Sequence, residues 1–351
     1  SCPGRCSISP CSRPSSSGNR VEDTRSIAVP EVDTDLAEWV TDALDRVEAG
    51  LTAAVASDDG LLDSSARHLL DAGGKRFRPM MVLLAAQLGD RDAAGVLPSA
   101  LVVELTHLAT LYHDDVMDEA AVRRGVASAN AAWSNSVAIL TGDYLFARAS
   151  EIVADLGPEA VRLQASTFAR LVRGQIRETL GPGESDDPVA HYLDVLADKT
   201  GSLIATSARF GAWLAGAPSE QVETVTRFGE AIGVAFQLAD DVIDIASDGK
   251  QSGKTPGTDL REGVPTLPSL YARRSAAAED ERLVTLLSDK VADADVDETL
   301  ALLRAHPALA ESSREVRRWA DLAREELLTL PDSAARAALL AICDSVVTRT
   351  T

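Results

Sequence analysis

The chain has 351 residues, of which 45% are hydrophobic and 25% are charged, so it is long enough for one large domain or two ordinary ones with a sizeable core. Its formal net charge is −20, whereas a nucleic-acid-binding protein of this size normally presents a basic face. The composition therefore argues against DNA or RNA as a partner. Against this acidic background, each local cluster of Lys and Arg is informative about function.

The first 32 residues are rich in Ser, Pro, Arg and Cys and lack the apolar run of a secretory signal. We expect residues 1–32 to form a disordered tail and residues 33–351 a single domain. Three of the four cysteines lie in this tail and Cys343 stands alone near the end, so their spacing indicates neither a zinc site nor a disulfide scaffold. Since no stretch of about 18 apolar residues is present, we expect a cytoplasmic protein without a transmembrane helix.

From about Asp33 onward, apolar residues recur every three or four positions and aromatic residues are scarce, which predicts helices throughout. We expect Thr34 or Asp35 to cap the first helix and Pro79 to begin the third. The predicted helices are 34–56, 60–71, 79–88, 95–120, 135–155, 159–180, 188–215, 219–247, 265–274, 278–291, 296–305, 309–329 and 332–348. Long amphipathic segments with short connections are typical of an all-α bundle.

The stretch "LYHDDVMDEAAVRRG" places three carboxylates after an apolar run. On a helix, Asp114 and Asp118 lie on the same face with Asp115 beside them, and like charges at this spacing repel unless a cation neutralises them. A single cluster of this kind is usually a solvated acidic surface.

The pattern recurs in "FQLADDVIDI", where Asp240, Asp241 and Asp244 repeat the spacing on a different helix. Two such clusters beside buried segments would repel strongly if they faced each other. Mg²⁺ resolves the repulsion, because it prefers carboxylate oxygens and completes its coordination shell with water and phosphate oxygens. The two clusters together predict a site for magnesium and a diphosphate.

Four basic groups oppose the acidic background and are candidate phosphate ligands, since Arg offers a planar fork and Lys a point charge. These groups are Arg123 with Arg124, then Lys75, Arg76 and Arg78 on a Gly-Gly loop, Lys199 followed by Thr200, and Lys254. Any one of them alone would be an ordinary surface residue. Their positions on glycine-bearing loops and beside the aspartates favour phosphate binding.

The motifs "GGKRFRP", "HDDVMDEAAVRRG", "GQ" at 174–175, "KTG", "FQLADDVID" and "GKTPGTDLREGVPTLP" resemble, in this order, those of the trans-isoprenyl diphosphate synthases. The resemblance covers roughly residues 35–350. It implies an isoprenoid-synthase-type helical bundle around a central cavity, usually as a homodimer. It also implies that the aspartate motifs bind Mg²⁺, commonly three ions, with Mn²⁺ as an alternative. The substrates would be isopentenyl diphosphate and an allylic diphosphate such as farnesyl or geranylgeranyl diphosphate, condensed head to tail.

The roles of individual residues follow from their match to the family's motifs. The expected metal ligands are Asp114, Asp118, Asp240, Asp241 and Asp244. The expected isopentenyl diphosphate pocket consists of Lys75, Arg78, His107 and Arg124. Arg123, Lys199 and Lys254 would hold the allylic diphosphate, with Thr200 and Gln237 near the reacting carbons. The residues expected to carry catalysis are Asp114, Asp115, Asp118, Asp240, Lys199, Thr200 and Gln237. One position departs from the family, because Val264 stands where a Lys is usual, which puts one phosphate contact in doubt.

Small residues before the first aspartate motif predict a long product. In the family, a bulky aromatic residue four or five positions before the first Asp blocks the pocket, whereas here Thr106, Ala109 and Thr110 are small. Each buried methylene of the growing chain contributes about 0.8 kcal/mol, so depth permits length, and we expect a product of about C30 to C50, suited to a quinone such as menaquinone. The alternative is that Phe146 closes the pocket and gives a C20 product, as in a geranylgeranyl diphosphate synthase.

Two other readings fit the sequence less well. Terpene cyclases and head-to-head synthases also use aspartate-rich helices, but they do not need the "GGKRFRP" loop. A non-catalytic subunit of a heteromeric prenyltransferase would be expected to lose one aspartate cluster or the basic loop, and both are present here. We expect at most a peripheral association with the membrane when the product is released.

Overall fold

The computed structural model describes residues 33–247 and 256–350, and Lys254 and the predicted tail lie outside them. The chain forms a bundle of helices with a single two-stranded hairpin in the described part. Up to the hairpin, the helices are α1 (Thr34–Val55), α2 (Gly60–Asp71), α3 (Phe77–Ala86) and α4 (Val96–Met117). The hairpin pairs β1 (Val122–Arg123) with β2 (Val126–Ala127). The next elements are α5 (Ala129–Ala132), α6 (Asn135–Asp155), α7 (Pro158–Leu180), α8 (Pro188–Leu196), a π-helical turn (Ala197–Gly201) and α9 (Ser202–Leu214).

The second half of the chain continues in helices. They are α10 (Ser219–Ala246), α11 (Thr258–Glu262), α12 (Leu267–Arg273), a 3₁₀ turn (Ala278–Asp280), α13 (Glu281–Leu286), a second 3₁₀ turn (Asp293–Asp295), α14 (Val296–Ala305), α15 (Pro307–Leu327) and α16 (Ala334–Thr348). The prediction of an all-α fold is confirmed. Among the described helices, none is both long and apolar enough to cross a lipid bilayer.

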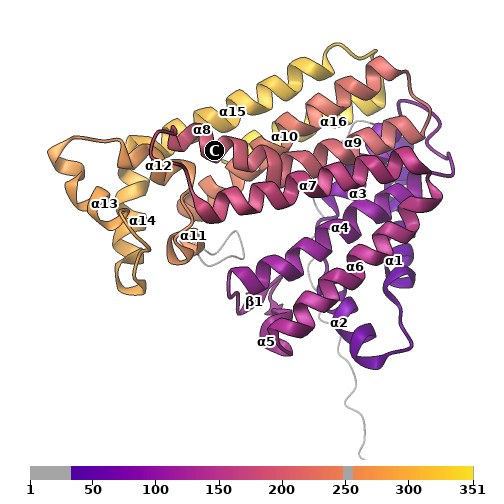
Figure 1. Cartoon of the computed structure of the whole chain (residues 1–351). Coiled ribbons are helices and arrows are strands. Elements are labelled where there is room, and N and C mark those ends of the chain that lie inside the picture. Colours follow the sequence, from indigo (N-terminus) through magenta and orange to yellow (C-terminus); the bar gives the residue numbers. More distant parts are fainter. Residues whose placement is uncertain (1–32, 248–255, 351) are drawn as a thin grey trace, which may run out of the picture.

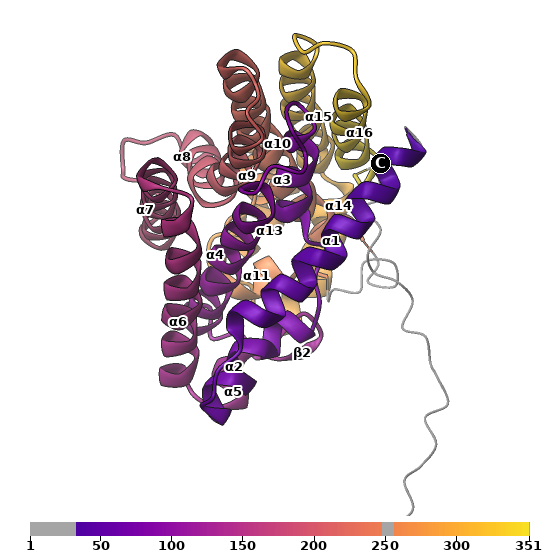
Figure 2. The same ribbon diagram turned by 90° about the vertical axis from the view of Figure 1, so that its right-hand side faces the viewer.

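The long helices lie side by side, with α4, α6 and α7 adjacent and the shorter α11, α13 and α14 gathered at one end (Figure 1). Turned by 90°, the molecule has α6 and α7 on one side and α1 and α16 on the other, with α3 and α4 between them (Figure 2). The most extensive packing is between α4 and α6 and between α10 and its neighbours α9 and α15. This packing fixes the ends of α4 and α10, where the aspartates lie.

Local chemistry explains where α1 and α3 begin and corrects two expectations. Asp33, rather than Thr34 or Asp35, caps α1, because its carboxylate accepts the backbone N–H groups of Asp35 at 2.9 Å and Leu36 at 3.3 Å. Helix α3 begins at Phe77, two residues before Pro79, which occupies the first turn where its missing N–H is harmless.

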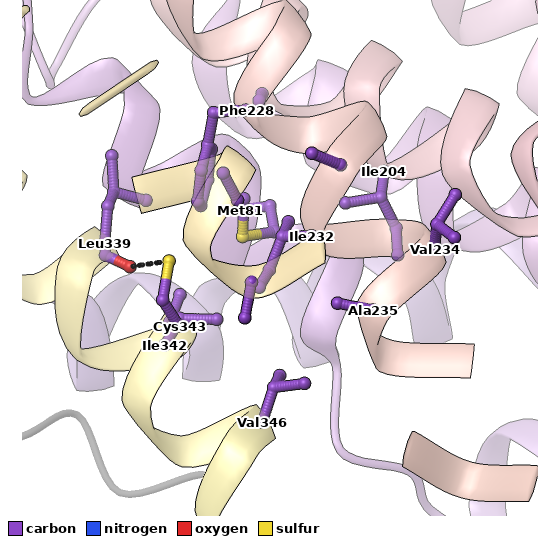
Figure 3. Close-up of a cluster of buried hydrophobic side chains, with 14 of the residues drawn as sticks. Met81, Ile204, Phe228, Ile232, Val234, Ala235, Leu339, Ile342, Cys343 and Val346 are labelled. Carbon is purple, nitrogen blue, oxygen red and sulfur yellow. Dashed lines mark hydrogen bonds between the residues drawn. The ribbon is translucent and has the colours of Figure 1, made fainter. Parts of the chain in front are cut away.

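Apolar side chains from helices far apart in sequence form the core. Phe228 and Ile232 of α10 pack with Met81 of α3 and with α16 residues such as Leu339 and Cys343 (Figure 3). The Cys343 thiol is buried and lies 3.8 Å from the Leu339 carbonyl oxygen. Because this cluster ties α3 to α10, it holds the Gly-Gly loop and the second aspartate motif in one rigid unit.

Helices α3 and α9 approach so closely that only glycine fits between them. A Cβ atom on Gly211 would lie 2.0 Å from the carbonyl oxygen of Val82. We expect Gly211→Ala to lower the free energy of unfolding by at least about 2 kcal/mol, because neither backbone can move without disturbing the core. Thermal or denaturant unfolding would measure the loss. Gly60→Ala is the matched control, since nothing lies within 4 Å of its Cβ position. Equal stability of the two variants would contradict this account of the packing.

Candidate functional site

The first aspartate motif lies at the C-terminal end of α4. Asp115 is fully buried, and its carboxylate accepts a hydrogen bond from Arg123 Nε at 2.5 Å, while its second oxygen has no partner among the described residues. Asp118 lies 3.8 Å from the same guanidinium. Asp114 makes no ion pair within the described structure, and burial raises the pKa of its carboxyl to about 6, although nearby Lys199 and Arg123 counteract this. Asp114 is therefore a half-buried carboxylate that forms no ion pair within the described structure.

The second motif lies at the C-terminal end of α10, and each of its aspartates is engaged differently. Asp241 is buried and accepts hydrogen bonds from the Tyr192 hydroxyl and, at 3.0 Å, from Gln237. Burial nevertheless raises the pKa of Asp241 to about 7, with repulsion from Asp240 and Asp244 adding to the effect. The backbone N–H groups at the start of α11 lie 3.4 Å from both carboxylate oxygens of Asp244.

Asp240 pairs with the far end of the chain. Its carboxylate lies 2.5 Å from a guanidinium nitrogen of Arg349, which follows α16. The same guanidinium lies over the ring of Phe236, 5.0 Å from its centroid, and that ring stacks on Phe77 of the "GGKRFRP" segment at 4.9 Å. A cation binding at Asp240 must therefore displace or share Arg349.

The π-helical turn lies close to both aspartate motifs. Lys199 donates to Glu178 of α7 at 2.5 Å, and the charges of Asp114 and Asp118 act on its ammonium group together with Glu178. The hydroxyl of the next residue, Thr200, lies 3.4 Å from the amide oxygen of Gln237. The turn thus places one residue toward the first motif and the following residue toward the second.

Glu262 of α11 provides a further link between the motifs. Burial raises the pKa of Glu262, and Asp118 and Asp244 raise it further, while Arg123 lowers it. A single carboxylate thus lies close enough to both motifs to feel their charge. The structure brings the two aspartate clusters to the same region, as the sequence predicts.

A group of arginines lies beside α4. Arg78 has a buried Nε atom without a partner among the described residues, and burial lowers its pKa to about 10, with Arg124 contributing. His107 lies among these arginines, and burial together with Arg78 and Arg124 lowers its pKa well below the usual range. His107 is therefore neutral at pH 7. Several cations with few protein anions nearby are a suitable site for a phosphate group.

Two arginines of this group, Arg124 and Arg76, already have partners within the protein, whereas the sequence suggested both as phosphate ligands. Arg124 lies at the hairpin turn, with a φ of 54°, and donates to the carbonyl oxygens of Leu69, at 2.8 Å, and Gly73. Arg76 is not available as a phosphate ligand, because it is buried and donates to Glu48 at 2.5 Å and Glu104 at 3.0 Å. Lys75, by contrast, is exposed on the Gly-Gly loop.

The residues expected to set product length follow α4 away from Asp114. Thr106 and Ala109 are almost fully buried, while Thr110 is half-buried. The hydroxyl groups of Thr106 and Thr110 donate to carbonyl oxygens of their own helix, at 2.8 Å in both cases. The Thr106 hydroxyl also lies 3.4 Å from the side-chain nitrogen of Gln164 on α7. Phe146 of α6 packs against Phe168 of α7, with ring centroids 4.2 Å apart.

Sequence reasoning missed several site residues because their signals are weak. Glu178 lies three positions after Gln175 on the same face of α7, which is a signal that could have been used. Glu104 needed the fold, since nothing in its sequence neighbourhood marks it as the partner of Arg76. Arg349 lies more than one hundred residues from Asp240 in sequence, so only the tertiary structure brings them together.

The residues described do not form a complete metal cage. No group of three His, Cys, Asp or Glu side chains within the described ranges is arranged to hold a metal ion. The donor set nevertheless fits Mg²⁺, which uses one or two carboxylates and takes its remaining ligands from water and phosphate oxygens. Asp114 and Asp118 on one side, and Asp240 and Asp244 on the other, are the carboxylates that would hold it.

Comparison with known proteins places this site in a wider context. The family described as "Polyprenyl synthetase" matches residues 59–303. A nonaprenyl diphosphate synthase from Mycobacterium tuberculosis is 53% identical over 306 residues, covering 87% of this chain and 91% of that protein. The crystal structure of a geranylgeranyl pyrophosphate synthase from Corynebacterium glutamicum, complexed with calcium and isoprenyl diphosphate, matches with a TM-score of 0.80 at 45% identity, covering 91% and 98% of the two chains. A decaprenyl diphosphate synthase from Rhodobacter capsulatus matches with a TM-score of 0.81 at 32% identity, covering 90% and 99%.

The buried pair between Arg76 and Glu104 supports the arginine pocket. The Glu104 side chain is 2% exposed, whereas that of Glu48, the other partner of Arg76, is 41% exposed. We expect Glu104→Gln to lower the free energy of unfolding by about 3 kcal/mol, because it leaves buried positive charge uncompensated. Glu48→Gln should cost less than about 1 kcal/mol, because water screens that pair. Denaturant unfolding of both variants tests this, and a larger loss for Glu48→Gln would contradict it.

Proposed function

The chain belongs to the polyprenyl synthetase family, and on this basis we propose that it condenses isopentenyl diphosphate head to tail onto an allylic diphosphate. The proposed product is a trans-polyprenyl diphosphate of about C30 to C50, whose chain gains about 0.8 kcal/mol for each methylene that it buries. One observation carries the proposal. The π-helical turn lies between the two aspartate motifs, with Lys199 near Asp114 and Asp118 and Thr200 beside Gln237.

We assign the two diphosphates to two sides of α4. Isopentenyl diphosphate binds among Lys75, Arg78, His107 and Arg124, where Arg78 has an unsatisfied donor. The allylic diphosphate binds between the aspartate motifs, where Lys199 and Arg123 neutralise the charge that develops as it leaves. Lys254, which belongs to the same proposed contact, lies outside the described residues. Val264 cannot supply a charge, so that position contributes no phosphate contact.

The remaining chemistry follows from how these residues hold the substrates. Departure of the diphosphate leaves an allylic cation, and we assign the hydroxyl oxygen of Thr200 and the amide oxygen of Gln237, 3.4 Å apart, to stabilising its positive charge. The isopentenyl double bond then attacks C1 of the cation, and a proton leaves. His107 is neutral but surrounded by arginines that lower its pKa, so it is a poor proton acceptor. We therefore propose that the released diphosphate takes the proton.

We propose Mg²⁺ as the metal ion, in up to three positions, with Mn²⁺ as an alternative. The metal would neutralise the leaving diphosphate as a Lewis acid. The Corynebacterium relative was crystallised with calcium and isoprenyl diphosphate, which supports the use of a divalent cation by this chain. Within this chain, Asp114 supports the assignment further, because its half-buried carboxylate forms no ion pair within the described structure.

Product length is the finer part of the proposal. The small side chains of Ala109 and Thr110 support a long product, as does the similarity to a nonaprenyl diphosphate synthase. The alternative is a C20 product, supported by the similarity to a geranylgeranyl pyrophosphate synthase and by the Phe146–Phe168 pair, which could close the pocket from α6 and α7. We propose that the product becomes a quinone side chain. A non-catalytic subunit is disfavoured, because both aspartate motifs and the arginine pocket are present.

We further propose a homodimer, supported by apolar side chains left exposed on neighbouring helices. Val172, Ile176 and Leu180 recur every fourth residue along α7, and Ile139 and Leu140 are exposed on α6. Such a stripe on two adjacent helices is suited to a second copy of the chain. A cytoplasmic location and, at most, peripheral membrane association during product release stay predictions from the sequence.

A product assay tests the reaction and the chain length. Purified protein is incubated with Mg²⁺, labelled isopentenyl diphosphate and farnesyl or geranylgeranyl diphosphate, and the dephosphorylated products are sized by chromatography. We expect a single long product from the wild type. Thr110→Phe should shorten it by several isoprene units, because a half-buried position on the path from Asp114 becomes blocked. Thr110→Val is the matched control and should leave the length unchanged. A C20 product from the wild type would favour the Phe146 alternative.

Metal binding should depend on pH in a defined direction. Burial raises the pKa of Asp114 to about 6 and of Asp241 to about 7, above the ordinary value of 3.8, so without metal the folded state binds more protons than the unfolded state. Between about pH 4 and 7, stability from these groups is therefore lost as pH rises. Mg²⁺ replaces those protons, so the Tm increase that Mg²⁺ causes should be larger at pH 8 than at pH 5.5. Differential scanning fluorimetry measures both.

Two variants separate this effect from other titrations. Asp114→Asn and Asp241→Asn should abolish turnover, retain the helical circular dichroism spectrum and reduce the pH dependence of the Mg²⁺ effect. Asp289→Asn, at an exposed position outside the site, should change none of these. Full activity in Asp114→Asn would contradict the metal assignment.

A further inference from the structure

The π-helical turn Ala197–Gly201 is a local irregularity in an otherwise continuous helix. The residues on both sides, Leu196 and Ser202, have ordinary right-handed helical dihedral angles, and the Ser202 N–H donates to the Ala197 carbonyl five residues earlier. Such turns are rare, and something in the surroundings must stabilise them. This turn carries Lys199 and Thr200, so whatever stabilises it also determines where these two side chains lie.

Asp198 is anchored by arginines of α7. One carboxylate oxygen lies 2.9 Å from Arg170 Nε, and the other lies 2.9 Å from Arg173 Nε. Arg177 lies further away, at 3.9 Å. Although partial burial disfavours its charge, hydrogen bonds from Arg173 and Arg170 keep the pKa of Asp198 below its usual value. Asp198 is therefore a charged anchor, and it precedes Lys199 directly.

Arg170 connects three elements at once. Besides Asp198, its guanidinium donates to Glu230 of α10 and lies 3.4 Å from the Ala197 carbonyl oxygen, the first residue of the turn. Inside the turn, the Ser202 hydroxyl donates to the Asp198 carbonyl at 2.6 Å. The turn is thus held from α7 and from α10 through a planar group that a Lys could not replace.

Close backbone contacts hold the turn on both sides. A Cβ atom on Gly174 of α7 would lie 2.8 Å from the backbone nitrogen of Lys199. One on Gly233 of α10 would lie 2.7 Å from the Cα atom of Gly201. The turn has little room to shift sideways between these helices. Its rotation about the helix axis is then fixed by the side-chain anchor at Asp198.

We propose that Asp198 is a positioning residue, held by Arg170 and Arg173, that fixes the π-helical turn so that Lys199 reaches the allylic diphosphate. This rests on the proposed function, because it assigns Lys199 to that substrate. Asp198 itself faces away from the aspartate motifs, toward α7, and acts only through the residues that follow it. Nothing in the anchor touches the arginine pocket beside His107, so isopentenyl diphosphate binding does not depend on it.

The exposure of the two arginines that hold Asp198 makes the inference testable. The Arg173 side chain is 58% exposed and that of Arg170 is 32% exposed, whereas the Asp198 side chain is 11% exposed. Because water reaches both arginines, loss of the Asp198 charge leaves no guanidinium fully buried, and we expect only a modest fall in global stability. If Asp198 only stabilised the fold, its replacement would change Tm without a selective effect on the KM for the allylic substrate. A positioning role predicts a selective effect on the allylic substrate with little change in Tm.

The experiment compares Asp198→Asn, Asp198→Glu and, as a control, Arg162→Ala. Arg162 is an exposed residue of α7 for which the described structure shows no ion pair. We expect Asp198→Asn to raise the KM for farnesyl diphosphate about tenfold, since a small misplacement of a substrate-holding group has effects of this order. The KM for isopentenyl diphosphate should change less than about twofold. Asp198→Glu should recover part of the loss, and Arg162→Ala should match the wild type. Binding of an unreactive farnesyl thiodiphosphate, measured by calorimetry, should weaken in parallel with the KM.

A double-mutant cycle with Lys199→Ala separates positioning from structure. If Asp198 acts through Lys199, Asp198→Asn should weaken thiodiphosphate binding by less than about twofold in the Lys199→Ala background. Additive effects, or equal changes in both KM values, would overturn the inference. These outcomes differ from a failure of the proposed function. If the proposed function is wrong, the wild-type protein itself elongates no primer.

Discussion

Negative charge concentrated at the ends of α4 and α10 is the constraint on which the rest of this structure depends. A buried carboxylate is tolerated only when a cation or hydrogen-bond donor compensates it. The protein provides a different partner for nearly every one. Arg123 compensates Asp115, Tyr192 and Gln237 compensate Asp241, backbone N–H groups compensate Asp244, and Arg349 compensates Asp240. Asp114 is the exception, because its half-buried carboxylate forms no ion pair within the described structure.

Under the proposed function, the same partners decide how the site changes when the metal and the diphosphate bind. Lys199 is held by Glu178 and Asp240 by Arg349, so both cations are already near the place where a diphosphate would bring more negative charge. Binding can then proceed by exchange of partners rather than by transfer of unpaired charges from water. An exchange of this kind avoids most of the desolvation cost that a bare buried carboxylate would impose. It also makes metal and diphosphate binding mutually dependent, because each supplies the partner that the other displaces.

Much of the fold and of the site could be predicted from the sequence. Helical periodicity located α2 and α6 at their observed boundaries, because their apolar stripes and caps are local features. The spacing of Asp114 and Asp118 likewise fixes a shared helix face without knowledge of the fold. The hairpin at Arg124 could not be predicted, because its turn needs positive φ at a residue that seldom adopts it. The π-helical turn and the Arg349–Asp240 pair depend on contacts between distant helices, to which local sequence patterns are blind. The same limit explains Arg76, which looks like a phosphate ligand in sequence but is neutralised by Glu48 and Glu104.

Helix α4 orders the chemistry of the site along its length. Asp118 and Asp114 lie at its C-terminal end, Thr110 one turn earlier, and His107 and Thr106 about another turn before that. Because a helix rises about 1.5 Å per residue, the eight residues from Asp114 to Thr106 span roughly 12 Å. Under the proposed function, a chain growing from the aspartates would pass successive helical turns whose side chains are small, while His107 and the arginines lie to one side. On that proposal, the helix that holds the diphosphate of the substrate would also line the path of its apolar chain, so the rigidity of α4 would tie product length to the position of the diphosphate.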